Sequence, residues 1–305
     1  MKKEHRAGFA VIFGAPNAGK STLLNRILGE KVAAVANKPQ TTRHRILGVL
    51  SRPAAQLIFL DTPGYHVSEK LLNRSIVSRA LAALADADAV LFLADGLRRG
   101  PEHEAALALV REKDRSQLVC AVSKADLAEP RALSAAAAEL EKALPGAPAV
   151  PVSAKTGKNI PKILDLLEAR LPASPPLYPE DALTDQPMRV IAAEFVREAV
   201  IRLTRDEIPY STAVTVDRYE EPKEEGGSPA RKTFIAATIH VEKENQKRIV
   251  IGAGGRRLQA IGTAARAGIE RLVGGPVYLE LFVRTTRDWT KNKTSLQGFG
   301  YRDPS

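Results

Sequence analysis

Hydrophobic and polar positions along the first half of the chain predict strands and helices in turn. Short apolar runs, typical of buried strands, are separated by longer stretches whose apolar residues recur at helical spacing. This alternation predicts an α/β fold in which helices cover a mostly parallel, six-stranded sheet. The predicted strands are residues 10–13, 45–50, 56–60, 89–94, 118–122 and 149–151. The predicted helices are residues 21–28, 75–84, 102–112, 129–143 and 160–170.

One pair of these strands cannot be parallel. Residues 45–50 and 56–60 are joined only by residues 51–55. A crossover between parallel neighbours needs about a dozen residues or more. We therefore expect this pair to be antiparallel within an otherwise parallel sheet.

The second half of the chain predicts a smaller α+β domain. A helical pattern over 188–204 precedes two strand-like segments, 210–219 and 232–241, with a polar, mobile turn at 220–231 between them. Two helices and a strand follow, in the order α-β-β-α-α-β. Their expected ranges are 247–251, 255–273 and 277–283.

A proline-rich segment separates the two halves. Residues 171–187 contain five prolines, at positions 172, 175, 176, 179 and 187. Proline fixes φ and lacks a backbone N–H, so this density excludes regular elements and stiffens the chain. We expect residues 1–172 to form the first domain, 173–187 a linker, and 188–305 the second domain with a C-terminal tail.

The most specific motif lies between the first predicted strand and helix. Residues 14–21, Gly-Ala-Pro-Asn-Ala-Gly-Lys-Ser, fit G-x-x-x-x-G-K-[ST], a loop whose backbone N–H groups face phosphates at a helix N-terminus. Lys20 is expected to reach the β- and γ-phosphates, and the Ser21 hydroxyl to bind Mg²⁺. The predicted phosphate-binding residues are Gly14, Asn17, Ala18, Gly19, Lys20, Ser21 and Thr22.

Two later segments are candidates for the metal and the γ-phosphate. Residues 40–44, Gln-Thr-Thr-Arg-His, precede a strand, and Thr42 or its neighbour Thr41 can place oxygens near Mg²⁺. Asp61, in Asp-Thr-Pro-Gly at a strand end, is expected to hold Mg²⁺ through water, and the Gly64 N–H to meet the γ-phosphate. Ser21, Thr42 and Asp61 are thus the predicted metal residues. The predicted catalytic residues are Lys20, Thr42, Asp61 and Gly64.

Two more strand ends carry residues suited to a guanine base. A carboxylate at Asp126 can accept hydrogen bonds from guanine N1–H and the 2-amino group, a donor pair that adenine lacks. The stem of Lys124 can lie along the base. The Ala154 N–H can meet guanine O6. The predicted base-binding residues are Ser123, Lys124, Asp126, Ser153, Ala154 and Lys155.

The second half contains a glycine loop between its two later predicted helices. Gly252 and Gly255 fit the GxxG loop of a KH domain, where the backbone approaches single-stranded nucleotides closely. The α-β-β-α-α-β order matches the type II arrangement. We interpret Trp289 and Phe299 as packing anchors. The predicted RNA-binding residues are Lys247, Gly252, Ala253, Gly254, Gly255, Arg256 and Arg257.

Composition narrows the partners and the compartment. The 305 residues carry a net charge of +10, which favours an anionic partner, nucleic acid before a membrane surface. The single cysteine, Cys120, excludes an internal disulfide and points to a reducing cytoplasm. The charged start followed by Gly14 and Pro16 does not read as a signal peptide. The apolar stretch at 81–93 contains Asp86 and Asp88 and is not expected to span a membrane.

These motifs together resemble the Era-like subfamily of translation-factor-related GTPases, which act in bacterial ribosome assembly. The resemblance covers nearly the whole chain. It implies a GTPase that uses GTP, GDP and Mg²⁺, binds 16S rRNA near its 3′ end and acts on the 30S subunit as a monomer. It also implies a cytoplasmic protein, with a fraction at the inner membrane face. Two alternatives remain open: a nucleotide-gated RNA-binding scaffold in which hydrolysis is incidental, and a peripheral membrane GTPase switch.

The chain departs from the family pattern at the base motif and has no obvious group to orient the attacking water. Ser123 stands where the family usually has asparagine, so hydrogen bonds made by an amide are shortened or lost. Tyr65 and His66 follow the Asp-Thr-Pro-Gly segment, without a glutamine. We expect slow intrinsic hydrolysis that a bound partner accelerates, and we interpret His66 as a loop residue rather than a general base.

The base motif yields a test of nucleotide choice. Because Asp126 is retained, we predict that specificity for GTP survives, with weakened nucleotide affinity. Competition of ATP and XTP against a fluorescent GTP analogue measures this. If either competes as strongly as GTP, the assigned role of Asp126 is wrong.

Overall fold

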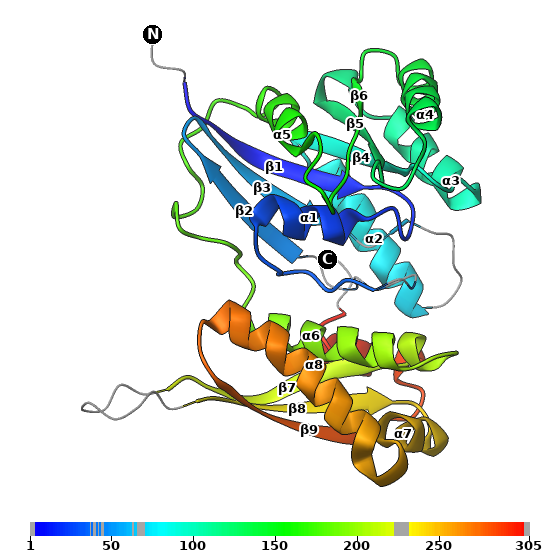
Figure 1. Ribbon diagram of the computed structural model, residues 1–305, viewed down its shortest axis with the longest axis vertical. Helices are drawn as coiled ribbons and strands as arrows, with labels where there is room; N and C mark the ends of the chain where they lie inside the picture. The colour runs from blue at the N-terminus through cyan, green and yellow to red at the C-terminus, as the bar shows by residue number, and fades with distance from the viewer. Residues whose placement is uncertain are drawn as a thin grey trace. The chain divides into compact units, whose positions relative to one another are not determined.

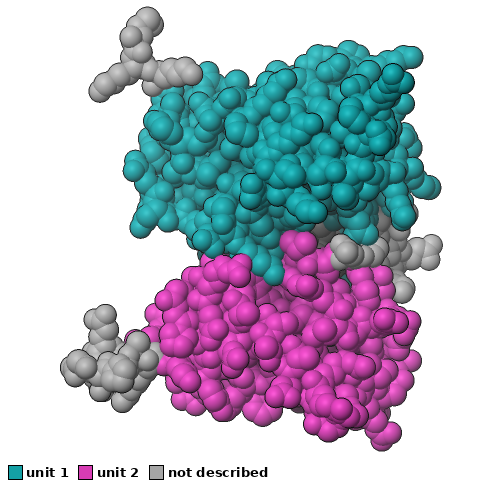
Figure 2. Space-filling model, viewed as in Figure 1, with its two compact units in different colours: residues 1–33, 42–185, 303–305 teal, residues 34–41, 186–302 magenta. Residues whose placement is uncertain are grey.

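The computed structural model describes residues 4–36, 38, 41, 43, 46–62, 64–65, 71–222 and 232–301. The chain forms two compact units, which Figure 2 colours separately. The first unit comprises residues 1–33, 42–185 and 303–305, and the second comprises residues 34–41 and 186–302. The short segment 34–41 thus groups with the second unit although it precedes most of the first in sequence.

The first unit is built on a six-stranded sheet (Figure 1). Its strands are β1 (Arg6–Phe13), β2 (Ile46–Arg52), β3 (Ala55–Asp61), β4 (Ala89–Asp95), β5 (Leu118–Ser123) and β6 (Ala149–Pro151). The order is β2-β3-β1-β4-β5-β6. Strand β2 pairs antiparallel with β3, and the other neighbours pair parallel. The predicted sheet and its antiparallel pair are confirmed.

Helices cover both faces of this sheet. They are α1 (Lys20–Leu28), α2 (Leu71–Ala85), α3 (Pro101–Arg111), α4 (Pro130–Ala143) and α5 (Ile160–Glu168). Apolar residues of α2, α3 and α4 form one buried cluster with the sheet, and those of α1 and α5 form another on its opposite face. Proline at the first position of α3 and of α4 pre-sets the helical φ where no N–H partner is needed.

The second unit has the predicted α-β-β-α-α-β order. Its elements are α6 (Met188–Leu203), β7 (Ala213–Glu220), β8 (Thr233–Val241), α7 (Glu244–Ile251), α8 (Arg256–Val273) and β9 (Val277–Thr285). Strands β7 and β8 pair antiparallel, whereas β8 and β9 pair parallel. Apolar residues of α6, α7 and α8 pack with all three strands. Most of the predicted turn at 220–231 lies outside the described residues.

Helix α7 begins three residues earlier than predicted because a side chain caps it. The Gln246 Oε1 atom accepts hydrogen bonds from the N–H groups of Glu242 and Lys243, at 3.0 and 3.2 Å. These bonds satisfy donors that have no partner inside a helix. The first residues of α7 are polar, so the sequence shows no apolar periodicity there from which this first turn could have been predicted.

The C-terminal segment of the second unit is anchored by aromatic packing. Trp289 is fully buried, and its indole N–H donates to the Ser211 carbonyl at 3.0 Å. Its ring meets Phe299 edge-on at 5.3 Å between centroids and stacks on Tyr301 at 6.0 Å. The interpretation of Trp289 and Phe299 as packing anchors is confirmed. The short helix α9 (Lys293–Gly298) lies within this segment.

The proline-rich segment follows the edge of the first unit's sheet. Its backbone N–H groups at Leu177 and Tyr178 donate to the Gln56 side chain at 2.7 and 2.9 Å. The Val49 N–H donates to the Leu183 carbonyl at 2.9 Å. These bonds fasten the segment to β2 and β3, and it groups with the first unit as far as residue 185.

Two further observations concern the environment of the chain. In the part of the chain that the structure describes, no helix is both long and apolar enough to cross a membrane. Cys120 is buried in β5, and burial raises the pKa of its thiol to about 12. The thiol is therefore protonated and unreactive at neutral pH.

Candidate nucleotide and RNA sites

The glycine-rich loop connects β1 to α1 at the carboxyl edge of the sheet. Gly14 has φ +154°, and a Cβ atom there would lie 2.3 Å from the Leu93 carbonyl oxygen at the end of β4. Only glycine allows this approach of the loop to the neighbouring strand. The loop backbone then turns into α1, whose Leu23 N–H donates to the Gly19 carbonyl at 2.8 Å. The N-terminus of a helix suits an anion, because its first backbone N–H groups point away from the helix.

Lys20 lies inside this loop. Its side chain is 6% exposed, and its ammonium donates to the carbonyls of Gly14 and Ala15 at 3.1 and 2.8 Å. Burial lowers the pKa of Lys20 to about 8, partly offset by the negative charge of Asp61. A phosphate beside this amine would favour its charged form. The structure thus places a cation where the motif predicts phosphate.

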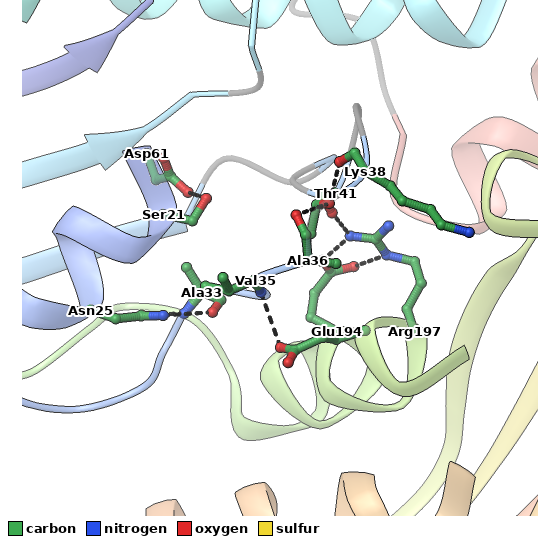
Figure 3. A network of polar contacts seen from close by, with 11 residues as sticks. Ser21, Asn25, Ala33, Val35, Ala36, Lys38, Thr41, Asp61, Glu194 and Arg197 are labelled. Atoms are coloured by element: carbon green, nitrogen blue, oxygen red, sulfur yellow. Dashed lines mark hydrogen bonds and ion pairs between the residues drawn. The ribbon is translucent and has the colours of Figure 1, made fainter. Parts of the chain in front are cut away.

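Residues predicted to serve Mg²⁺ and the γ-phosphate come together at the same edge. The Ser21 hydroxyl donates to Asp61 Oδ2 at 2.7 Å (Figure 3). The Tyr65 N–H donates to the Gly14 carbonyl at 3.2 Å, which places the end of the Asp-Thr-Pro-Gly segment against the phosphate loop. A Cβ on Gly64 would lie 2.5 Å from the Pro16 Cα atom. Hydroxyl and carboxylate oxygens are the ligands that Mg²⁺ prefers.

The hydrogen bonds of Thr41 bear on which of Thr41 and Thr42 would bind Mg²⁺. Its hydroxyl donates to the Lys38 carbonyl at 2.6 Å and approaches the Ala36 carbonyl at 3.3 Å, within its own loop. We therefore retain Thr42 as the candidate metal ligand. Thr42 itself lies outside the described residues, as does His66.

Two other loops at this edge build the candidate base site. Ser153 donates its hydroxyl to Asp126 Oδ1 at 2.7 Å, and this bond is the largest cause of the lowered pKa of Asp126. The Ser153 oxygen in turn accepts the Thr156 N–H at 3.1 Å. Asp126 is therefore an ionised, oriented and exposed carboxylate. It keeps acceptor capacity for an N–H pair such as that of guanine.

Lys124 is held by a residue that the sequence analysis did not single out. Its ammonium pairs with Asp95 Oδ2 at 2.6 Å, and its backbone adopts a left-handed φ of 59°. Asp95 ends β4, at the same sheet edge as the motifs. An acidic residue at the carboxyl end of a parallel strand is the signal that could have revealed it.

Ser123 differs from the rest of the base site. Its side chain is 6% exposed, and its hydroxyl has no hydrogen-bond partner among the described residues. Asp126, three residues further along the chain, is hydrogen-bonded by Ser153, whereas the Ser123 hydroxyl bonds to none of the described residues. The loss of an asparagine amide at this position is therefore not offset by the serine hydroxyl.

The predicted RNA loop connects α7 to α8 in the second unit. Gly252, Gly254 and Gly255 all have left-handed φ angles, of 71°, 59° and 78°. The arginine side chains that follow partly serve the loop itself: Arg256 Nε donates to the Ala253 carbonyl at 3.3 Å, and Arg257 donates to the Ile249 carbonyl. Each guanidinium has five donors, so both keep capacity for phosphate.

A phosphate-binding loop at the edge of a mostly parallel sheet, followed by a domain with a GxxG loop between helices, defines a P-loop GTPase joined to a KH domain. Family comparison agrees: residues 9–124 match a model described as a 50S ribosome-binding GTPase, and residues 207–290 match a KH domain model. Curated relatives extend the match to nearly the whole chain, and they are GTPases named Era. The chain belongs to the GTPase Era family.

Two of these relatives and two solved structures give the extent of the match. GTPase Era of Geobacter metallireducens is 45% identical over 97% of this chain and 98% of its own, and that of Geotalea uraniireducens is 41% identical over 98% and 99%. A crystal structure of Era with MgGDPNP and nucleotides 1506-1542 of 16S ribosomal RNA is 38% identical, with a TM-score of 0.89 over 97% of this chain and 99% of that chain. A structure of an Aquifex aeolicus Era variant bound to GDP·AlF4⁻ is 37% identical, with the same TM-score and coverage.

Ser123 supplies the first prediction from this site. We expect Ser123→Asn to tighten GDP and GTP binding about threefold to tenfold, because one hydrogen bond contributes about 0.5–1.5 kcal/mol. Titration with a fluorescent nucleotide measures the dissociation constants. Ser123→Ala is the matched control and should change little. Equal or weaker binding by a folded asparagine variant would refute this account.

Lys20 supplies a prediction for pH. Its pKa of about 8 in the free protein means that the amine loses its proton as the pH rises above that value. A bound phosphate raises this pKa, so binding takes up a proton there, and affinity should fall towards tenfold per pH unit above about 8. GDP affinity measured from pH 7 to 9 tests this. Lys20→Met should bind GDP weakly, and its affinity should lack this dependence on pH. Any loss of affinity caused by deprotonation of the guanine base would appear in both proteins, so the comparison removes it.

Proposed function

We propose that the chain is a GTP-hydrolysing switch that holds single-stranded RNA near the 3′ end of 16S rRNA and acts in 30S subunit assembly. The observation that carries this proposal is the presence, in one chain, of a glycine-rich loop that surrounds Lys20, a Ser21–Asp61 pair beside it, and a GxxG loop. Support also comes from the 97% coverage by the Era structure that contains MgGDPNP and 16S rRNA nucleotides. The nucleotide belongs to the first unit and the RNA to the second.

The phosphate end of the nucleotide site is assigned to residues of β1, α1 and β3. Amides of the glycine-rich loop and the Lys20 ammonium would bind the β- and γ-phosphates. The oxygens of Ser21 and Asp61, 2.7 Å apart, fit a hard divalent cation and would hold Mg²⁺. Bound Mg²⁺ neutralises charge on the phosphate oxygens during transfer. The Gly64 N–H would meet the γ-phosphate from the opposite side.

The guanine end is assigned to the loops after β5 and β6. Asp126, held by Ser153, would accept the guanine N1–H and 2-amino hydrogens. Lys124, held by Asp95, would present its stem to the base. Ala154 and Lys155 would complete the pocket from the loop after β6. Selectivity for guanine over adenine follows because Asp126 lacks a donor for adenine's acceptor nitrogen.

Slow intrinsic hydrolysis is part of the proposal. Tyr65, the residue after Gly64, packs its ring against Phe13 at 6.1 Å between centroids. It is therefore engaged with the core rather than placed to orient an attacking water. Acceleration would come from a bound partner.

The RNA contact is assigned to the loop between α7 and α8. Its glycines let the backbone approach four nucleotides, and flanking apolar side chains would contact bases. Ile249, beside the loop, is 39% exposed and offers such a surface. Lys247, Arg256 and Arg257 would supply positive charge that Ala253 and Gly254 do not.

The remaining partner assignments are also proposals. We propose that the chain acts as a monomer in the cytoplasm, with a fraction bound peripherally at the inner membrane face. The support for the membrane fraction is the net charge of +10, which attracts an anionic surface.

A charge in the glycine loop tests the proposed function. Gly254→Asp should weaken binding of a 16S 3′-end oligoribonucleotide on the order of a hundredfold, because the carboxylate repels phosphates at close range. GTP binding should be unchanged. Asp tolerates left-handed φ, and a Cβ at Gly254 meets nothing within 4 Å, so the fold should persist.

Gly275→Asp is the matched control. It makes the same charge change in the same unit, and a Cβ there also meets nothing within 4 Å. Its RNA affinity should stay close to that of the unchanged protein. RNA affinity retained by Gly254→Asp would remove the loop from the RNA site.

A further inference from the structure

The loop between α1 and β2 is fastened to helix α6 of the second unit. Residues 34–41 of this loop group with residues 186–302 rather than with the strands that flank them in sequence (Figure 2). Figure 3 shows two of the contacts that hold them, from Val35 and from Thr41 to side chains of α6. The loop ends next to Thr42, the residue proposed above to reach Mg²⁺ and the γ-phosphate.

The central contact of this loop is made by Arg197 of α6. Its guanidinium donates to both carboxylate oxygens of Glu194, through Nε at 2.9 Å and through Nη2. Nη2 also donates to the Thr41 carbonyl. Arg197 and Glu194 are 0% and 2% exposed, so the charge pair is removed from water. The fork of an arginine can serve a carboxylate and a carbonyl together, which the point charge of lysine cannot.

Two more contacts hold the same loop on α6. The Val35 N–H donates to Glu198 Oε2 at 3.0 Å, and the Lys38 ammonium donates to the Thr204 carbonyl at 2.9 Å. With the Thr41 contact, both ends and the middle of the 34–41 segment are bonded to residues 197–204. The segment has no helix or strand of its own among its described residues, so these side chains set its course.

The other end of the loop is fastened to the nucleotide site. Asn25 of α1 donates to the Ala33 carbonyl at 2.8 Å and accepts the N–H groups of Val32 and Ala33 at 3.0 and 2.9 Å. Helix α1 begins at Lys20 and Ser21, the phosphate and metal residues. Residues 32–41 are therefore bonded first to the helix of the phosphate loop and then to α6.

We propose that Arg197 is the positioning residue through which the nucleotide state changes the RNA affinity of the second unit. One peptide bond joins Thr41 to Thr42, and consecutive Cα atoms are about 3.8 Å apart. Movement of Thr42 towards or away from the γ-phosphate therefore displaces the carbonyl that Arg197 holds. The sites are coupled because the two ligands bias one shared segment. This inference rests on the proposed role of Thr42.

The test compares RNA affinity in two nucleotide states. A fluorescent 16S 3′-end oligoribonucleotide is titrated into the full chain saturated with Mg²⁺ and either a non-hydrolysable GTP analogue or GDP. We expect the two dissociation constants to differ by about tenfold in the unchanged protein, within the usual range of coupling between sites. Arg197→Lys, which keeps the charge beside Glu194 but loses the fork, should bring their ratio close to one.

Two further variants keep the test decisive. Lys38→Met removes the contact of the loop with the Thr204 carbonyl and should partly lower the ratio of the two RNA dissociation constants. This variant tests the inference if Arg197→Lys does not fold. Arg202→Met is the matched control, because Arg202 lies on α6 with its side chain 65% exposed and only a 3.5 Å contact with Glu198. It should keep the full ratio. Melting temperatures of all variants verify folding.

The outcomes separate this inference from the function on which it rests. Failure of the unchanged protein to bind nucleotide or RNA would refute the proposed function itself. Binding of both ligands with a ratio of one would refute the coupling alone. A ratio retained by folded Arg197→Lys and Lys38→Met would also overturn the inference. A ratio lost instead in a Pro175→Ala, Pro176→Ala double variant would move the coupling to the proline-rich segment.

Discussion

Parallel pairing of β1 with β3 and β4 is the constraint on which the nucleotide site depends. Parallel strands bring their carboxyl ends to one edge, so the segments after β1, β3, β5 and β6 meet although they are far apart in sequence. The close approach of Gly14 to the Leu93 carbonyl fixes the phosphate loop against β4. Lys20, Ser21 and Asp61 then lie where backbone amides, a cation and oxygen ligands can act on one triphosphate.

Burial gives this edge its electrostatic character. Lys20 is kept from water, which lowers its pKa and makes the ammonium readily stabilised by an incoming anion. At the base end, a hydrogen bond from Ser153 keeps Asp126 ionised. The phosphate end of the site therefore offers a cation for phosphate, and the base end offers an anion for the N–H donors of a base. Ser123, whose hydroxyl has no hydrogen-bond partner in the described part of the chain, is the position at which the base site is least well held.

The sequence predicted the sheet, its antiparallel pair and the second unit's element order because each rests on local patterns. Apolar periodicity located the strands, and the five residues between 50 and 56 decided the pairing direction. The structure also placed Ser21 beside Asp61 and Ser153 beside Asp126, both from motifs at strand ends. Asp95 was not foreseen, although its place directly after the predicted strand 89–94 was a signal that the sequence analysis did not use. The contact of Arg197 with Thr41 was not foreseen either, because it joins residues 156 positions apart without a shared motif.

The contact of Arg197 with Thr41 also gives a buried charge pair a second role, because the same guanidinium binds both Glu194 and a loop carbonyl. A desolvated ion pair seldom stabilises a fold more than apolar residues of the same size would, and removal of one partner leaves an uncompensated charge. Arg197 and Glu194 nevertheless bind a loop of irregular backbone beside the proposed metal ligand. In the proposed coupling, this segment passes the nucleotide state to α6, which packs on α8, the helix that begins at the glycine loop.

GTP turnover measured with and without a single-stranded 16S rRNA 3′-end oligonucleotide tests the account most directly. It examines the nucleotide site, the RNA loop and their coupling in the full chain. The account predicts slow turnover by the protein alone and clear acceleration by the RNA, which the Gly254→Asp variant does not show. Rapid turnover without RNA, or a rate that RNA leaves unchanged, would contradict it.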